Sequence, residues 1–311
     1  MLKNLVLAAA TSLAMSTAAF AGWAPPGPVN LQIGFGAGGE TDTLGRVIAS
    51  VMEEQTGWQV IAENKPGGGG IAMFTGIAVG PNDGSVIGLG VNMPVMINLV
   101  LRGDKLPFNL DSFDYLGTVA RAQLAIIAKG DAPFNDIKGL VEYSKANGGV
   151  AVAFDAKPQE LLLQRINAET GANLKPLSTK SSAEELQLLL GGQVVAAFNA
   201  GKHIPFIEKG EMKMIASANK DRHNYAPDTP TLIEQGIDAY VDPFFYFAAP
   251  VGLSAEAKEG LSTALANAIA SDKVKKIVAD ALANEVNNLG PDGTKQMLVD
   301  GMVVVKVLFG K

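Results

Sequence analysis

Short apolar runs alternate with helix-spaced apolar residues along most of the chain, and this alternation constrains the fold more than any other feature. Residues 29–34 are typical of a strand, and residues 44–52 then place apolar side chains at i, i+3, i+4, i+7 and i+8, which is one face of a helix. Further apolar runs follow at 58–63 and 86–90, with a second helical pattern between them. Strands separated by helices at this spacing predict a parallel sheet with right-handed crossovers.

A second cycle of the same kind begins near residue 123. Residues 113–119 and 124–128 are expected to be strands that cross between domains, and strand and helix patterns then alternate to residue 217. The chain returns through 244–249 and finishes in helices. We therefore expect an α/β protein with a discontinuous first domain, residues 22–122 and 245–311, and an inserted second domain, residues 123–244. A cleft between two such domains is the usual place for a small-molecule site.

The N-terminus has the pattern of a secretory signal. Lys3 supplies a positive start, an Ala-rich apolar stretch follows to Phe20, and Ala19-Phe20-Ala21 fits a small-x-small cleavage site. The stretch is too short and too rich in alanine to span a membrane well. We expect residues 1–21 to be removed after Ala21 and the mature protein to be exported to the periplasm, not inserted in a membrane.

Composition excludes several kinds of site. The chain of 311 residues has a formal net charge of −6 and no cysteine. The first property disfavours long-range attraction to nucleic acid, and the second excludes disulfides, thiolate metal sites and a cysteine nucleophile. An anionic ligand would have to be held by local features such as helix N-termini.

The loop from Phe35 to Asp42 follows a strand and opens a helix. Its glycines allow close approach of a ligand to the backbone, and the free N–H groups at the helix start favour an anion. Gly34, Gly36 and Gly39 also satisfy G-x-G-x-x-G, so a dinucleotide site is a competing interpretation, which export disfavours. Asp42 could either stabilise the helix dipole or order the ligand and its waters.

Other loops occupy equivalent places after strands. They are the glycine run 67–70, the segments 155–159 and 179–182, and the turn at Asn199. Ligands in open α/β sheets sit at such ends, although Ser and Asn there can equally be helix caps, and Ser182 is expected to be one.

Catalysis has little support in the sequence. There are two histidines, and neither a metal-binding histidine spacing nor a G-x-S-x-G nucleophile turn is present. Acidic pairs such as Glu184-Glu185 are expected to face solvent. The run Phe244 to Phe247 could line a cleft or belong to the core.

The order of several motifs resembles the solute-binding proteins of tripartite tricarboxylate transporters, the Bug-type periplasmic receptors. The motifs are Phe35 to Asp42 with Arg46, Glu63-Asn64-Lys65-Pro66-Gly67, Leu189 to Val194, Asp221-Arg222, Pro227 to Gly236, and Ala249-Pro250.

The resemblance implies a periplasmic-binding-protein fold, type II-like, with two Rossmann-like domains that close over the ligand like a Venus flytrap. It implies that a small carboxylate, in particular a dicarboxylate, is held by backbone N–H groups and waters, without catalysis, cofactor or metal. It further implies a monomer that hands the ligand to a large and a small membrane subunit. The second-domain loops depart from the family pattern at Phe154, Asp155, Lys157, Gln159 and Thr179.

A sensory receptor for a signalling partner and a periplasmic enzyme are the alternative functions. The candidate ligand-binding residues are Phe35, Gly36, Ala37, Gly38, Gly39, Thr41, Asp42, Gly69, Asn92, Phe154, Asp155, Lys157, Gln159, Thr179, Ser181, Asn199 and Phe245.

Overall fold

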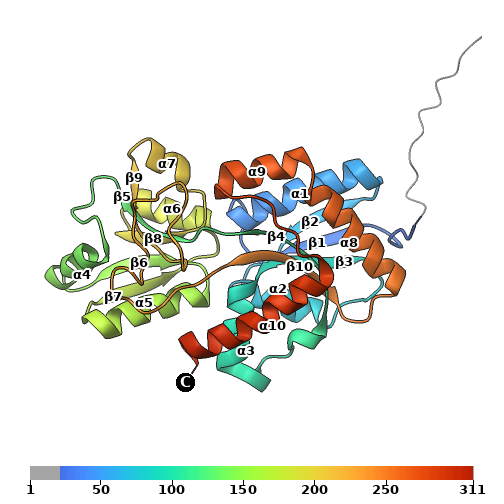
Figure 1. The fold of residues 1–311 in the computed structure, drawn as a ribbon, viewed down its shortest axis with the longest axis horizontal. Helices are drawn as coiled ribbons and strands as arrows, with labels where there is room; N and C mark the ends of the chain where they lie inside the picture. The colour runs from blue at the N-terminus through green and yellow to red at the C-terminus, as the bar shows by residue number, and fades with distance from the viewer. Residues whose placement is uncertain (1–21, 311) are drawn as a thin grey trace, which may run out of the picture.

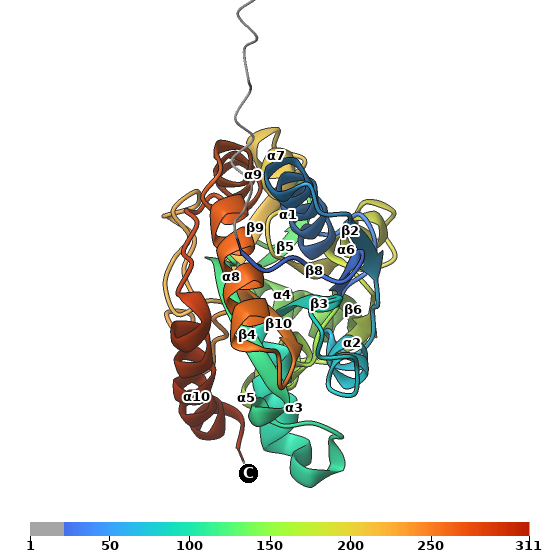
Figure 2. The same ribbon diagram turned by 90° about the vertical axis from the view of Figure 1, so that its right-hand side faces the viewer.

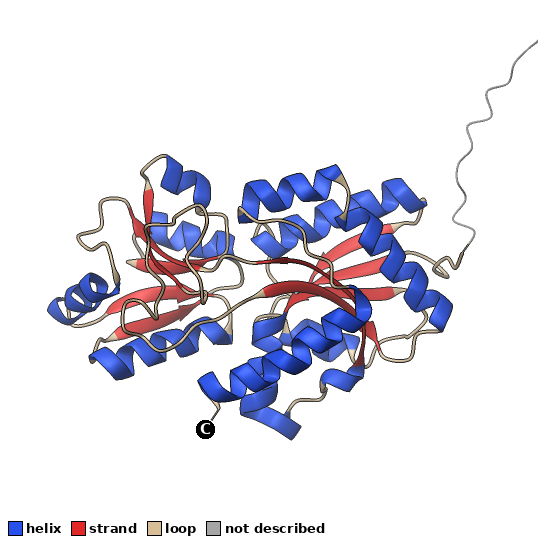
Figure 3. Cartoon of the chain, in the orientation of Figure 1, coloured by secondary structure: helices blue, strands red, loops and turns tan. Residues whose placement is uncertain are grey.

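Two five-stranded sheets, each flanked by helices, lie side by side and form two lobes (Figures 1 and 3). The structure is a computed structural model and describes residues 22–310, so the predicted signal sequence lies outside the described residues. The strand order is β2-β1-β3-β10-β4 in the first sheet and β7-β6-β8-β5-β9 in the second. The α/β, two-lobed architecture expected from the sequence is confirmed.

The first three strands of the first lobe are parallel, as predicted. They are β1 (Val29–Ile33), β2 (Val60–Asn64) and β3 (Val86–Val91), joined by α1 (Glu40–Thr56) and α2 (Ile71–Ile77). The last strand along the chain, β10 (Phe244–Pro250), lies between β3 and β4 (Phe113–Arg121) and is antiparallel to both. The sheet is therefore mixed.

Helices cover both faces of this first sheet. One face carries α1 with α8 (Ala255–Ile269) and α9 (Asp272–Leu282), and the other carries α2, α3 (Asn92–Arg102) and α10 (Gly290–Phe309) (Figure 2). The alternation of β10 matches this arrangement, because Phe245 and Phe247 pack with the first group and Tyr246 with the second. Two short 3-10 turns, Gly103–Lys105 and Leu110–Ser112, join α3 to β4.

Helix α3 is absent from the sequence prediction. Apart from Asn98, residues 93–101 are all apolar. A continuous apolar run of this kind cannot be assigned to a helix or a strand by periodicity alone.

The second lobe repeats the α/β pattern. Parallel strands β6 (Val150–Phe154), β7 (Leu174–Ser178) and β8 (Ala196–Asn199) pair with each other, and β5 (Ala125–Lys129) runs antiparallel to β8 and to β9 (Met212–Ser217). The helices are α4 (Ile137–Ala146), α5 (Lys157–Thr170), α6 (Ser182–Leu190) and α7 (Ile204–Glu208). Strands and helices alternate in this lobe as far as Ser217, as the sequence pattern predicts.

Two segments connect the lobes, residues 122–124 and residues 218–243, and we call them the connectors. They run side by side, because the Ala122 N–H donates to the Pro243 carbonyl at 2.8 Å and the Ala218 N–H donates to the Leu124 carbonyl at 2.9 Å. The end of α9 also reaches the first connector, where Gln123 Nε2 donates to the Leu282 carbonyl at 2.9 Å. Within residues 22–310, no helix is long and apolar enough to cross a membrane.

Candidate ligand-binding site

The glycine-rich loop between β1 and α1 is held in shape by one carboxylate. The Gly38 N–H, in a left-handed backbone conformation with φ +77°, donates to Asp42 Oδ2 at 2.8 Å. Asp42 Oδ1 accepts from Arg46 Nε and from Asn64 Nδ2, each at 2.8 Å. Both oxygens of Asp42 are thus used by protein donors, so this residue positions the loop from beneath.

The same loop has backbone donors at residues that line the space between the lobes. The Glu40 N–H donates across that space to Ser182 Oγ at 3.1 Å. The N–H groups of Gly39 and Thr41, by contrast, have no protein acceptor within residues 22–310. They belong to the first turn of a 17-residue helix, where unpaired N–H groups and the helix dipole favour a bound anion.

The facing wall comes from the starts of α5 and α6 in the second lobe. Gln159 Oε1 accepts from the N–H groups of Asp155 and Ala156, at 2.7 and 3.2 Å, and so fixes the turn into α5. Ser181 Oγ accepts from the Glu184 N–H at 3.3 Å and caps α6. The prediction that Ser182 is this cap was wrong, because the Ser182 hydroxyl contacts the first lobe instead.

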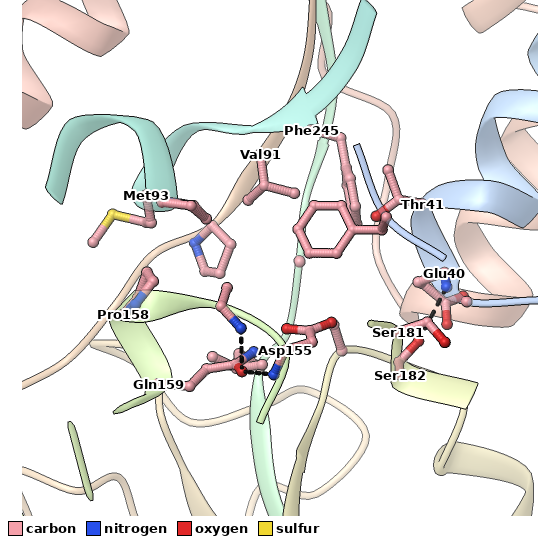
Figure 4. A pocket seen from close by; sticks show the side chains of 18 of the residues that line it. Glu40, Thr41, Val91, Met93, Asp155, Pro158, Gln159, Ser181, Ser182 and Phe245 are labelled. Carbon is pink, nitrogen blue, oxygen red and sulfur yellow. Dashed lines mark hydrogen bonds between the residues drawn. The ribbon is translucent and has the colours of Figure 1, made fainter. Parts of the chain in front are cut away.

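These walls enclose a cavity of about 60 Å³ between the lobes, which we call the interlobe cavity (Figure 4). In Figure 4, Asp155, Pro158 and Gln159 lie across from Val91 and Phe245, while Glu40, Ser181 and Ser182 close one side. Of the residues predicted from the sequence, those that line it are Phe35, Gly39, Thr41, Asp155, Gln159, Ser181 and Phe245. A ligand wholly enclosed in this cavity must be small, and a dinucleotide would not fit inside it.

A second, open groove of about 800 Å³ continues outward from the other side of Phe35 and Asp155. The predicted residues Gly69, Phe154, Lys157 and Thr179 line this groove rather than the cavity. Lys157 Nζ is paired there with Glu160 Oε2 at 2.8 Å, so its charge is compensated within α5.

The remaining predicted residues support the walls without lining the cavity. Gly36 donates its N–H to the Lys180 carbonyl at 2.8 Å across the lobes, and Ala37 follows it in the loop. Asn92 Oδ1 accepts from the Met93 and Phe244 N–H groups. Asn199 Nδ2 donates to the Ser182 carbonyl at 3.0 Å. Gly38 and Asp42 act as described above.

Residues 44–302 match the family described as tripartite tricarboxylate transporter family receptor. The chain belongs to this family. The receptor is 27% identical over 283 residues to the protein BugT of Bordetella pertussis, an alignment that covers 89% of this chain and 86% of BugT. It is also 27% identical over 277 residues to a Cupriavidus necator protein named for the gbd 5′ region, with 85% and 82% coverage.

Among solved structures, the periplasmic binding protein BugD superposes on this receptor with a TM-score of 0.82. The two are 29% identical, and the match covers 92% of this chain and 97% of BugD. MatC from Rhodopseudomonas palustris, determined with bound malate, has a TM-score of 0.81 at 22% identity and covers 91% of this chain and 99% of its own. The second likeness shows a shared fold.

Three polar residues that line the cavity are missing from the candidate residues predicted from the sequence, namely Glu40, Ser182 and Glu185. The expectation that Glu185 faces solvent was wrong, because it is only 1% exposed. A signal for it existed. Ser182, Glu185, Leu186 and Leu189 stand at i, i+3, i+4 and i+7, which is the buried face of α6.

Burial changes the acid–base properties of this cavity. Desolvation raises the pKa of Glu40 to about 7, against an opposing effect of nearby Lys202, and raises the pKa of Asp155 to about 6. Desolvation together with the neighbouring charge of Asp155 raises the pKa of Glu185 well above its usual value. A contact that compensates negative charge would therefore stabilise the ionised form of these carboxyl groups.

A buried polar chain runs from this wall to the connectors. His203 Nδ1 lies 3.2 Å from Asn199 Oδ1, and its Nε2 lies 2.6 Å from the Tyr225 hydroxyl. That hydroxyl lies 2.9 Å from His223 Nδ1, and His223 Nε2 lies 2.8 Å from Asn219 Oδ1. Desolvation lowers the pKa of both histidines to about 3, so both are neutral and neither resembles a catalytic base.

Proposed function

We propose that this receptor binds a small organic carboxylate in the interlobe cavity, in the periplasm, and delivers it to a tripartite tricarboxylate-type membrane transporter. The family supports the class of activity, since its description is that of a transporter receptor. The observation that carries the proposal is the pair of unpaired N–H groups at Gly39 and Thr41, at the start of α1 and on the cavity wall.

The moving units in this proposal are the two lobes, residues 22–122 with 245–311 and residues 123–244. Opposite walls of the cavity come from different lobes, so a ligand bridging them favours closure. Three of the hydrogen bonds between the lobes involve the glycine-rich loop and α1. They join Gly36 to Lys180, Glu40 to Ser182, and Lys202 Nζ to Thr43 Oγ1 at 2.9 Å. MatC, which shares this fold, was determined with bound malate, a small organic carboxylate.

Thermal unfolding tests this proposal. A ligand that binds only the folded state stabilises it by RT ln(1 + [L]/Kd), about 2.7 kcal/mol at a hundredfold excess over Kd. Protein stripped of bound compounds by unfolding and refolding should show a raised Tm with at least one member of a panel of C3 to C8 mono- and dicarboxylates, amino acids and aromatic acids. No shift across the panel would overturn the proposal.

A matched pair of variants localises the site. A β-carbon at Gly39 would lie 3.0 Å from Ser181 Cβ and 3.4 Å from Ser182 Oγ. Gly39→Val should therefore fill the part of the cavity at the start of α1, where the carboxylate is proposed to bind, and abolish the Tm shift. Gly76 on α2 is exposed and has no atom within 4 Å of such a carbon, so Gly76→Val is the control. Cells lacking the gene should lose uptake of the identified acid, and the wild-type gene, but not Gly39→Val, should restore it.

A further inference from the structure

The interlobe cavity is lined by three acidic side chains. Glu40, Asp155 and Glu185 all contribute to its wall, and no lysine, arginine or histidine of the described chain does. Glu40 comes from the first lobe, whereas the other two come from the second. A site that recognised only anions would not be built this way, because three carboxyls repel a second negative group on the ligand.

Two oxygens in this wall have no hydrogen-bond partner among the described residues. Glu185 is 1% exposed, and its Oε1 is unpaired, while its Oε2 has one long contact of 3.5 Å from Asn199 Nδ2. Glu40 is 5% exposed, and its Oε2 is likewise unpaired. A buried acceptor without a donor costs about 1–3 kcal/mol, and more if charged. The cavity wall therefore has unused capacity to accept hydrogen bonds.

A structural role explains the positions of these acids but not their unpaired oxygens. Glu40 opens α1 and Glu185 lies one turn into α6, where a negative charge interacts favourably with the helix dipole. An acid serving that purpose alone can face solvent, as neighbouring Glu184 does when its Oε2 accepts from the Lys180 N–H. Glu185 turns inward instead, toward a cavity it shares with Asp155.

The rest of the wall fits the body of a small amine-bearing molecule. Phe35 and Phe245 place aromatic rings on the cavity, and a cation beside an aromatic face gains roughly 0.5–2 kcal/mol. Val91, Met93 and Pro94 supply apolar surface. Gly39 and Thr41, whose N–H groups have no acceptor among the described residues, line the same cavity, so donors and acceptors are both present.

We propose that the ligand of this receptor is a zwitterion, whose carboxylate binds the start of α1 and whose ammonium group is held by Asp155 and Glu185, with Glu40 alongside. This inference rests on the proposed carboxylate-binding function and narrows its ligand class. The ammonium N–H donors would meet the unpaired oxygens, and its charge would offset the repulsion between the carboxyls. It replaces the dicarboxylate expected from the resemblance, since a second ligand carboxylate would face this acidic wall.

Matched ligand pairs test the inference by isothermal titration calorimetry at pH 7.5. The pairs share a carbon skeleton and differ by the amino group, namely propionate with β-alanine, butyrate with 4-aminobutyrate, and succinate with aspartate. We expect at least one amino acid to bind ten or more times tighter than its unaminated partner. Amines without a carboxylate, such as propylamine, should bind more weakly than that amino acid.

Two nearly isosteric variants assign the preference to this wall. Glu185→Gln and Asp155→Asn should each reduce the amino-group preference at least tenfold, whatever they do to the affinity for the plain acid. Glu142→Gln, at an exposed acid on α4 of the same lobe, should change neither. Far-ultraviolet circular dichroism and Tm verify that each variant is folded. If one of the two wall variants does not fold, the other is sufficient for the test.

The outcomes separate the two proposals. Plain acids or diacids that bind as tightly as, or tighter than, their amino counterparts would overturn the zwitterion and leave the carboxylate function standing. This is also the result expected if protonated Asp155 and Glu185 donated to a second ligand carboxylate. An amino preference that survives both wall variants would overturn the assignment to these residues, and binding by neither set would overturn the proposed function itself.

Discussion

A methyl group at Gly201 should hold the two lobes apart. Gly201 follows β8 in the second lobe and adopts φ +149°, and a β-carbon built there would lie 2.0 Å from the carbonyl oxygen of Ala281 on α9. The same carbon would lie 3.2 Å from Glu40 Cδ at the cavity. Backbone atoms cannot turn aside as a flexible side chain can, so the variant Gly201→Ala must move the lobes.

The size of the effect follows from the distances. Ordinary contact of a β-carbon begins at 3.4 Å, so the lobes must part here by about 1.4 Å, the difference from the 2.0 Å clash. A similar displacement would lengthen the interlobe hydrogen bonds of Gly36, Glu40 and Lys202, now 2.8–3.1 Å, beyond bonding range. At roughly 1 kcal/mol each, their loss weakens closure by about 2–3 kcal/mol, or about 30- to 150-fold in Kd.

Titration calorimetry with the best ligand of the panel measures this change, and small-angle scattering measures the accompanying loss of ligand-induced compaction. Backbone strain of about 1–3 kcal/mol also accompanies alanine in a conformation reserved for glycine, and it should lower Tm. Gly210→Ala is the control, because Gly210 has φ +72° and no atom within 4 Å of the added carbon. A Kd within threefold of wild type, with normal compaction, would refute this account of closure.

Three further predictions concern the supports of the site. Asp42→Ala removes the acceptor of three hydrogen bonds beneath the loop and should lower the unfolding free energy in urea by about 2–4 kcal/mol, with Asp42→Asn recovering part of it. Tyr225→Phe strips two buried imidazole nitrogens of their shared partner and should cost about 2–4 kcal/mol by calorimetry, and a loss below 0.5 kcal/mol would contradict the chain described above. Because the pKa of Glu40 is raised to about 7 in the folded protein, the native state binds more protons than the unfolded state, so its contribution to stability is complete below about pH 4 and is lost as pH rises toward 7. Glu40→Gln should therefore remove up to about 3 kcal/mol of pH dependence in that window, measured on unliganded protein, and parallel pH profiles for variant and wild type would contradict the assignment.

Local patterns were sufficient to predict most of the elements of the fold. The period of residues 44–52 predicted α1, and the glycines after β1 predicted a loop able to approach a ligand. Helix α3 was not predicted, because residues 93–101 form an almost continuous apolar run that periodicity alone cannot assign to a helix or a strand. The position of β10 between β3 and β4 also has no local signature in the sequence, because it depends on where the chain re-enters the first sheet after the second lobe.

The composition of the site was harder to predict because it depends on how the lobes meet. Glu40 and Ser182 are 142 positions apart in the chain and touch across the cavity. No sequence pattern near either residue predicts that contact. Asp155 was recognised as a departure from the family pattern, but its relation to Glu185 appears only when α5 and α6 start at the same wall.

The polar chain between Asn199 and Asn219 carries a fixed number of hydrogens. Two neutral imidazoles and one phenol supply three hydrogens for four contacts, and the amide oxygens at both ends are acceptors because their nitrogens donate elsewhere. The contact left without a hydrogen is the longest, at Asn199, so the other three all point toward Asn219.

Contacts of Asn219 with the connectors set the direction of these hydrogen bonds. The Asn219 amide donates to the carbonyls of Ala122 and Val241, one on each connector, and its oxygen accepts from the Leu124 N–H. A lobe rotation that released this amide would let it turn over, and its nitrogen would then require His223 Nε2 as an acceptor. Every hydrogen out to His203 would then reverse direction. We predict that opening switches the tautomers of both imidazoles, which ¹⁵N chemical shifts with and without ligand would detect, and unchanged shifts would show that Asn219 keeps its orientation throughout.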